Sequence, residues 1–450
     1  MAGQTFSSTA APGSAQYAID QSALGRFQMI AIFVLMGLNG LDGFDAFAIN
    51  FASPGIAADW GVDKKTLGFI KSMNLIGMGF GSLLIAPLAD RFGRRPVILI
   101  CTGVLSISML ACAFVETVLW LSIWRVITGL GIGAMLASIT AMAAEFSNMK
   151  YRALCVSISA CGYLIGSVLG GLASAELLEV YSWRSIFIFG GIISALYIPV
   201  IAWRVPETIA FLSGRQLPGD LQLANQNLQK MGLATVKTLG PKPDKSKMPL
   251  VRLFSGSMAM VTIAVTLAYF FQIITFYYFV GWVPDILVDL GYSQADATRV
   301  LTAASFGGVF GALGLGWVAS RIGMTLPTSL AAVMGGILVW RFGASGADLL
   351  TLSTLGVGAG FFMNASIVMC YALMARAFPA DIRALGSGFV LGVGRTGGVL
   401  GPILGGFLFQ ASVDTGSASL IMACGAFACG AIVLTIGPAL RRQENSLAKA

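Results

Sequence analysis

Five ionisable side chains lie inside long apolar segments, and their types and spacing suit the binding of an acid and a proton. They are Asp42, Asp45, Arg125, Glu145 and Arg395. An ionisable residue inside a membrane-spanning segment costs several kcal/mol and by default marks a transport pathway or a proton relay. These five residues are therefore the first candidates for a functional site.

Asp42 and Asp45 are three residues apart. On a helix they share a face, about 5 Å from each other, and two ionised carboxylates at that distance repel. One of them should hold a proton near neutral pH, which is the property that proton coupling requires. The alternative is that one aspartate forms a structural ion pair with Arg125.

The two arginines are candidates for binding a carboxylate. Arg125 lies about 9 Å from the end of its apolar segment, at the depth of Asp45, so it can bind an acid bidentately and exchange that partner for the aspartate. A permanent salt bridge is the alternative. Arg395 lies near mid-membrane between glycines 394, 397 and 398, which allow close approach of a ligand or helix. It is the first candidate in the C-terminal half, unless it braces a helix carbonyl.

Glu145 follows Arg125 by twenty residues on the same apolar segment. This spacing predicts a position at the opposite end of the helix, close to Lys150 and Arg152. We expect a gate or coupling residue there, with a solvated surface pair as the alternative.

Other polar and aromatic residues inside the apolar segments are weaker candidates for contacts with a ligand. These are Phe271, Gln272, Tyr278, Asn364 and Tyr371. Hydrogen bonding between helices explains each of the polar ones equally well. Trp282 is expected in the aromatic belt at the membrane surface.

Composition predicts the elements that position these residues. The chain has 450 residues, of which 56% are hydrophobic and 11% charged, whereas a soluble domain carries roughly 25% charged residues. A window of about 19 residues finds twelve apolar spans, which predicts an all-α integral membrane protein with twelve transmembrane helices in two six-helix bundles. The expected spans are 27–52, 67–89, 96–115, 119–144, 153–175, 185–203, 258–283, 298–319, 326–342, 349–377, 382–409 and 417–440.

Polar stretches divide the chain. We expect a cytoplasmic tail at 1–26, with 1–21 disordered, bundles at 27–203 and 255–440, a cytoplasmic linker at 204–254 and a tail at 441–450. Lys and Arg concentrate in the loops on the side of the termini, which predicts that both termini are cytoplasmic. Lys71 is assigned to the sparse basic residues of the opposite loops.

The two halves share sequence. Residues 86–95 (APLADRFGRR) match 316–323 (GWVASRIG), and 151–154 (YRAL) match 382–385 (IRAL). Related halves are typical of alternating-access transporters, whose substrate site lies between them.

Several function classes are excluded. The chain has seven cysteines without CxxC spacing and no histidine, so we expect neither a metal site nor a cofactor. No catalytic motif predicts an enzyme, and the basic residues lie in short loops rather than in a surface for nucleic acid. A monomer is expected.

The loop Leu88 to Arg95 resembles the signature loop of the major facilitator superfamily, with Ala86 where the family usually has glycine. The resemblance implies that this loop and its flanking arginines form a gate, with a plain topology anchor as the alternative. The residues concerned are Asp90, Arg91, Gly93, Arg94, Arg95, Arg152 and Arg383.

Within that superfamily, residues 41–45 (LDGFD), 276–284 (FYYFVGWVP) and 378–402 look like the motifs of the aromatic acid:proton symporters. This resemblance implies import of a benzoate- or hydroxybenzoate-like acid with protons across a bacterial inner membrane. The alternatives are a carrier of a non-aromatic carboxylate such as a muconate-like diacid, a drug antiporter, and a membrane receptor that binds the acid without transport.

Overall fold

The computed structural model describes residues 14–240, 250–346, 348–379 and 382–447. Within these ranges twelve helical spans are long and apolar enough to cross a membrane, which confirms the predicted number. The spans of the first bundle are α2 (Arg26–Trp60), α3 (Lys64–Phe80, continued through a π-helical turn and α4 (Ala89–Phe92)), α5 (Arg94–Phe114), α6 (Val118–Glu145), α7 (Arg152–Val180) and α8 (Arg184–Arg204).

The second bundle repeats the arrangement, with its fifth span broken into two helices. Its helices are α11 (Ser257–Asp289), α12 (Gln294–Ile322), α13 (Thr325–Ala344), α14 (Leu349–Ala377), α15 (Arg383–Gly394), α16 (Thr396–Gln410) and α17 (Thr415–Leu447). Between the bundles lie α9 (Ile209–Arg215), α10 (Asp220–Lys230) and a 3₁₀ turn at Leu250–Phe254. The predicted linker at 204–254 includes residues 241–249, which lie outside the described ranges.

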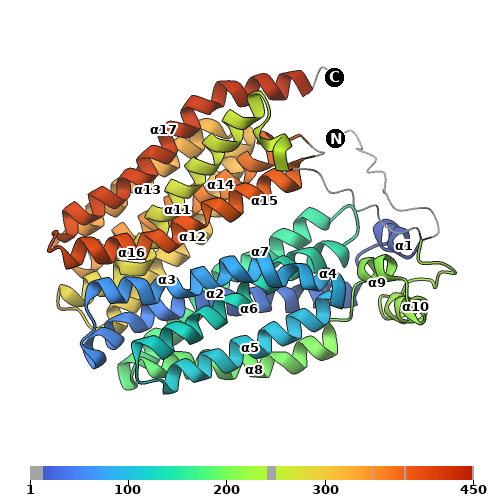
Figure 1. Cartoon of the computed structure of the whole chain (residues 1–450), viewed down its shortest axis with the longest axis horizontal. Helices are drawn as coiled ribbons and strands as arrows, with labels where there is room; N and C mark the ends of the chain where they lie inside the picture. Colours follow the sequence, from blue (N-terminus) through green and yellow to red (C-terminus); the bar gives the residue numbers. More distant parts are fainter. Residues whose placement is uncertain (1–13, 241–249, 347, 380–381, 448–450) are drawn as a thin grey trace.

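Figure 1 shows the two bundles side by side, close together at one end and farther apart at the end that carries both termini, α9 and α10. We call these the joined end and the termini end. The bundles contact each other mainly through α3 with α16, α7 with α12, and α2 with α11. If the two halves were interchanged, the contact of α3 with α16 would coincide with that of α7 with α12, and the contact of α2 with α11 would coincide with itself. The interface therefore has approximate two-fold symmetry.

The sequence repeat is visible in the backbone. Gly93 and Gly323 end the second span of their halves with φ values of 107° and 99°. Tyr151 and Ile382 precede α7 and α15 with φ, ψ of −111°, 6° and −112°, 2°. Only glycine adopts such a positive φ readily, which explains why this residue recurs at the same place in both halves.

The expectation for the N-terminal tail is corrected. Residues 15–21, expected to be disordered, form the short helix α1 (Ala15–Gln21), because Ser14 caps its first turn and Asp20 forms an ion pair with Arg152 of α7 at 2.5 Å. Residues 1–13 lie outside the described ranges. At the joined end, Asp63 caps α3 by accepting from Thr66, and this hydrogen bond lowers the pKa of the Asp63 carboxyl.

Candidate functional site

A fully buried ion pair joins α2 to α6. The Arg125 guanidinium donates to Asp45 Oδ1 at 2.7 Å and to the Asp45 carbonyl oxygen at 3.0 Å, and both side chains are 0% exposed. Asn74 of α3 donates to Asp45 Oδ2 at 3.3 Å. In this conformation the charge of Arg125 is therefore neutralised by a residue of its own bundle. Arg125 and Asp45, which were predicted to lie at the same depth in the membrane, are in direct contact.

Asp42 has a different environment from its neighbour. It is 0% exposed, and neither carboxylate oxygen has a hydrogen-bond partner among the described residues. Between the two aspartates, Gly43 lets α2 approach α7, because a Cβ at this position would collide with the carbonyl oxygen of Tyr163. The Asp-Gly-Phe-Asp sequence thus places one unpaired and one paired carboxyl group at a close helix crossing.

Arg395 occupies the break between α15 and α16. Its guanidinium lies within electrostatic reach of three tyrosines of the same bundle, Tyr269, Tyr277 and Tyr371. The hydroxyl groups of Tyr269 and Tyr371 are 3.3 Å apart. Arg395 is half-buried and, among the described residues, no carboxylate forms an ion pair with it. The guanidinium is thus surrounded by tyrosine hydroxyl groups, an arrangement that suits the binding of an anion with polar substituents.

Tyr163 of α7 connects the two charged regions. Its side chain lies near that of Tyr277 of the other bundle, and Arg395 and Asp42 are both within electrostatic range of it. The Asp42 region and the Arg395 region are therefore both close to one tyrosine at the interface between the bundles. Sequence reasoning missed Tyr163, because a single tyrosine inside an apolar segment carries no distinguishing local pattern.

The weaker candidates separate into two groups. Tyr371 joins the Arg395 cluster and is 40% exposed. The others are engaged inside their own bundle: Gln272 Nε2 lies 3.5 Å from the Met363 carbonyl oxygen, Asn364 donates to Gly360 of its own helix, and the Tyr278 hydroxyl contacts Ser419 at 2.9 Å. Phe271 is half-buried against Phe270. Helix packing accounts for these contacts.

The signature loop contacts the first bundle and the beginning of the linker. Arg94 forms an ion pair with Glu145 at 2.8 Å, so the partner of Glu145 is this loop rather than Lys150 or Arg152. The backbone N–H groups of Arg94 and Arg95 donate to the Glu207 carboxylate at 3.2 Å, a residue that sequence reasoning did not select.

The remaining members of the predicted gate set lie at the same end. Arg95 also donates to the Ala202 carbonyl oxygen at 2.6 Å, and Arg152 binds Asp20. Arg383 donates to the Phe378 carbonyl oxygen at 3.3 Å, whereas Asp90 and Arg91 are exposed. The predicted gate residues thus surround the termini end of the molecule.

Two residues near the joined end differ from expectation. Lys71, assigned to a loop, lies inside α3 with its side chain 0% exposed and paired with Asp285 of α11. Trp282, expected at the membrane surface, is 0% exposed and donates to the Pro402 carbonyl oxygen at 3.1 Å. Lys71 is buried because α11 extends to Asp289, six residues beyond the expected span, and Asp285 on this extension pairs with it. Trp282 is buried because it packs against α16 of its own bundle, where its ring also contacts Phe409.

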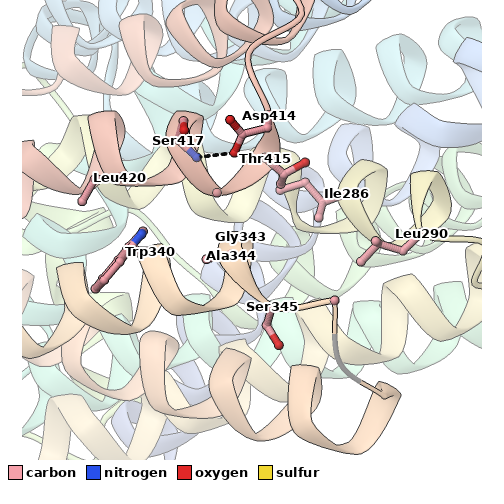
Figure 2. Close-up of a pocket in the computed structure, with 12 residues that line it drawn as sticks. Ile286, Leu290, Trp340, Gly343, Ala344, Ser345, Asp414, Thr415, Ser417 and Leu420 are labelled. Carbon is pink, nitrogen blue, oxygen red and sulfur yellow. Dashed lines mark hydrogen bonds between the residues drawn. The ribbon is translucent and has the colours of Figure 1, made fainter.

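A separate hollow of about 460 Å³ lies at the joined end of the second bundle, between α11, α13 and α17. Figure 2 shows the residues that line it. None of the described residues that line it is cationic, and the one charged residue among them is Asp414. The pKa of Asp414 is lowered because it accepts the backbone N–H of Ser417 at 2.8 Å. An ionised carboxylate makes this hollow unsuited to an organic acid.

Comparison with known proteins decides the family. A sequence profile of the Major Facilitator Superfamily matches residues 35–343 and 265–449. The chain belongs to the Major Facilitator Superfamily. The resemblance of the signature loop is thereby confirmed, and a member of this superfamily is a transporter rather than an enzyme.

Relatives of this superfamily member carry the names of aromatic acid transporters. It is 30% identical to the gallate transporter of Pseudomonas putida over 94% of this chain and 95% of the relative. It is 31% identical to the 4-hydroxybenzoate transporter of the same organism, over 85% and 86%. The fold resembles the Escherichia coli xylose transporter in a partially occluded inward-open conformation, with a TM-score of 0.72 and 16% identity over 91% and 97% of the two chains.

Proposed function

We propose that the chain is a proton-coupled symporter that imports a small aromatic carboxylate, benzoate- or hydroxybenzoate-like, across a bacterial inner membrane by alternating access. The observation that carries the proposal is that a buried carboxyl group, Asp42, and a cation, Arg395, both lie within electrostatic range of Tyr163 at the interface between the bundles. Among the described residues, Asp42 has no hydrogen-bond partner and Arg395 has no acidic partner. The names of the relatives support the aromatic class of substrate.

In this proposal Arg395 binds the substrate carboxylate. A guanidinium presents two parallel N–H groups that match the two oxygens of a carboxylate. The neighbouring hydroxyl groups of Tyr269, Tyr277 and Tyr371 are placed to bond ring hydroxyls, and their rings offer surfaces on which an aromatic substrate stacks. Arg125 takes part when it exchanges Asp45 for the substrate in another conformation.

Asp42 carries the proton. A carboxyl group without a counter-ion or hydrogen-bond donor is stable in a dry interior only when it is protonated. The ionised Asp45, held by Arg125, adds repulsion against a second negative charge three residues away. When water reaches Asp42 from one side of the membrane, that penalty falls and the proton leaves. Glu145 and Arg94 then act as a gate pair at the termini end.

The orientation is part of the proposal. The exposed Asp90 and Arg91, together with the pairs of Arg94 and Arg152, lie at the termini end, and a cytoplasmic position for this end agrees with the excess of Lys and Arg in its loops. The protein acts as a monomer surrounded by lipid, and its partners are the acid and protons.

Uptake by purified protein in proteoliposomes tests the function. Radiolabelled benzoate, 4-hydroxybenzoate, gallate and muconate are offered with and without an inwardly directed proton gradient. We expect gradient-driven accumulation of at least one aromatic acid. Accumulation of muconate alone, or extrusion of an organic cation, would show that the substrate is not an aromatic acid. Binding of an aromatic acid without any flux would indicate a receptor.

A further inference from the structure

A buried ion pair with no role in the proposed substrate site connects the two bundles at the joined end. Lys71 of α3 and Asp285 of α11 form this pair, with side chains 0% and 2% exposed. Lys71 also donates to the Gly281 carbonyl oxygen at 2.7 Å and lies 3.9 Å from the centre of the Trp282 ring. Ser53 of α2 donates to Asp285 Oδ2 at 2.9 Å.

The two charges of this pair belong to different bundles. Separating the bundles at the joined end therefore separates the charges. Removing one member of a buried pair leaves the other uncompensated, which is strongly destabilising, whereas replacing both by apolar residues is often neutral or stabilising. The pair favours the closed arrangement only while both charges are present and in contact.

Weaker contacts surround the pair. Nearer the surface, Lys64 contacts Asp289 at 2.6 Å between the same two helices, but both side chains are solvent-exposed and such pairs contribute little. On the other side, Ser72 of α3 donates to the Val399 carbonyl oxygen of α16 at 2.7 Å. The buried pair is thus the strongest electrostatic contact in a region where the bundles already pack closely.

Helix α3 links this region to the candidate proton site. Asn74 follows Lys71 by three residues, so both lie on one face of α3, and Asn74 donates to Asp45 at 3.3 Å. A shift of α3 that separates Lys71 from Asp285 also moves the donor of Asp45. The contact between bundles and the buried aspartate therefore respond to the same helix movement.

We propose that Lys71 and Asp285 form a buried gate pair: their contact holds the joined end closed, and their separation accompanies its opening. The inference deepens the alternating-access function proposed above and rests on it. Both are positioning residues, since neither contacts the Arg395 cluster. On this reasoning, loss of one charge opens the joined end, and loss of both charges leaves it closed.

Thiol labelling tests the gate pair without any substrate. The reporter is Ser72→Cys, since Ser72 is buried between the bundles, and the control reporter is Ser106→Cys, which is buried inside the first bundle where Ser106 bonds Gly191. Cys161 and Cys424, the two cysteines that are not fully buried, are replaced by alanine in the background. A membrane-impermeant maleimide is added to intact cells and, separately, to inverted vesicles.

In Lys71→Met and in Asp285→Asn we expect the Ser72→Cys reporter to label about tenfold faster or more than in the native background, from one side of the membrane only. The double variant Lys71→Met/Asp285→Leu should label as slowly as the native background. The control reporter at residue 106 should remain unreactive in all of them.

Three results would overturn the gate pair: unchanged labelling in both single variants, fast labelling in the double variant, or equal acceleration at residue 106, which would indicate general loosening of the fold. Failure of the proposed function has a different signature. If no acid is transported while labelling follows the expected pattern, the gate pair stands and the substrate class is wrong. If the Ser72→Cys reporter is labelled in inverted vesicles but not in intact cells, the joined end faces the cytoplasm, and the proposed orientation in the membrane is reversed.

Discussion

Replacing Arg395 by glutamine should weaken binding of the aromatic acid at least about thirtyfold. The guanidinium is half-buried at the break between α15 and α16, and within the described residues it has hydroxyl neighbours but no carboxylate partner. Truncating one member of a buried, hydrogen-bonded charge pair costs about 2–5 kcal/mol, and each 1.4 kcal/mol is about tenfold in Kd. The lower limit of about 2 kcal/mol gives about thirtyfold.

Binding of radiolabelled 4-hydroxybenzoate to detergent-purified protein measures this effect without a proton gradient. Arg395→Lys keeps the charge but loses the planar fork, so we expect an intermediate loss of about tenfold. Arg341→Gln, at an exposed arginine of the joined end, is the matched control and should leave Kd unchanged. A Kd within about threefold of the native value in Arg395→Gln, well below the loss derived from a buried charge pair, would refute Arg395 as the carboxylate ligand.

Three further predictions concern the first bundle. Asp42→Asn should retain substrate binding and exchange of substrate across the membrane, but it should lose accumulation driven by a proton gradient, because asparagine cannot release a proton. Gradient-driven accumulation at the native level would show that another residue carries the proton. Gly43→Ala should destabilise the protein by about 1–3 kcal/mol in thermal unfolding, because the added methyl group meets the Tyr163 backbone, whereas Gly79→Ala, which has open space around it, should not. Glu145→Gln should remove the ion pair with Arg94 and increase the labelling of a cysteine near the termini end; labelling at the native rate would show that the pair does not hold that end.

Hydropathy predicted the fold well, because a chain that crosses the membrane must satisfy its backbone hydrogen bonds internally, which long apolar helices do. The twelve spans and the family follow from that constraint and from the loop at 88–95. The ends of the helices were predicted less well. Helix α11 continues past its apolar run to Asp289, since its last turns are covered by the other bundle rather than by lipid.

The candidate site was predicted in part. The contact of Asp45 with Arg125 could be anticipated, because an embedded arginine and an embedded aspartate at equal depth have few other partners. The cluster around Arg395 could not, since its tyrosines come from α11 and α14, and sequence spacing does not reveal which helices adjoin. Lys71 was misassigned because a lysine seven residues from a helix end resembles a surface residue until its partner is known.

The matched backbone at Gly93 and Gly323 has a consequence for how the two halves tolerate substitution. The second half keeps the positive φ of Gly323, but its sequence has Ser320 where the first half has Asp90, and Met324 where the first has Arg94. The backbone geometry and one arginine (Arg91 and Arg321) thus recur in both halves, whereas the charges of Asp90 and Arg94 occur in the first half alone. A saturation mutagenesis scan should therefore find the two glycines equally intolerant and the flanking positions unequal, with removal of charge more harmful in the first half than in the second.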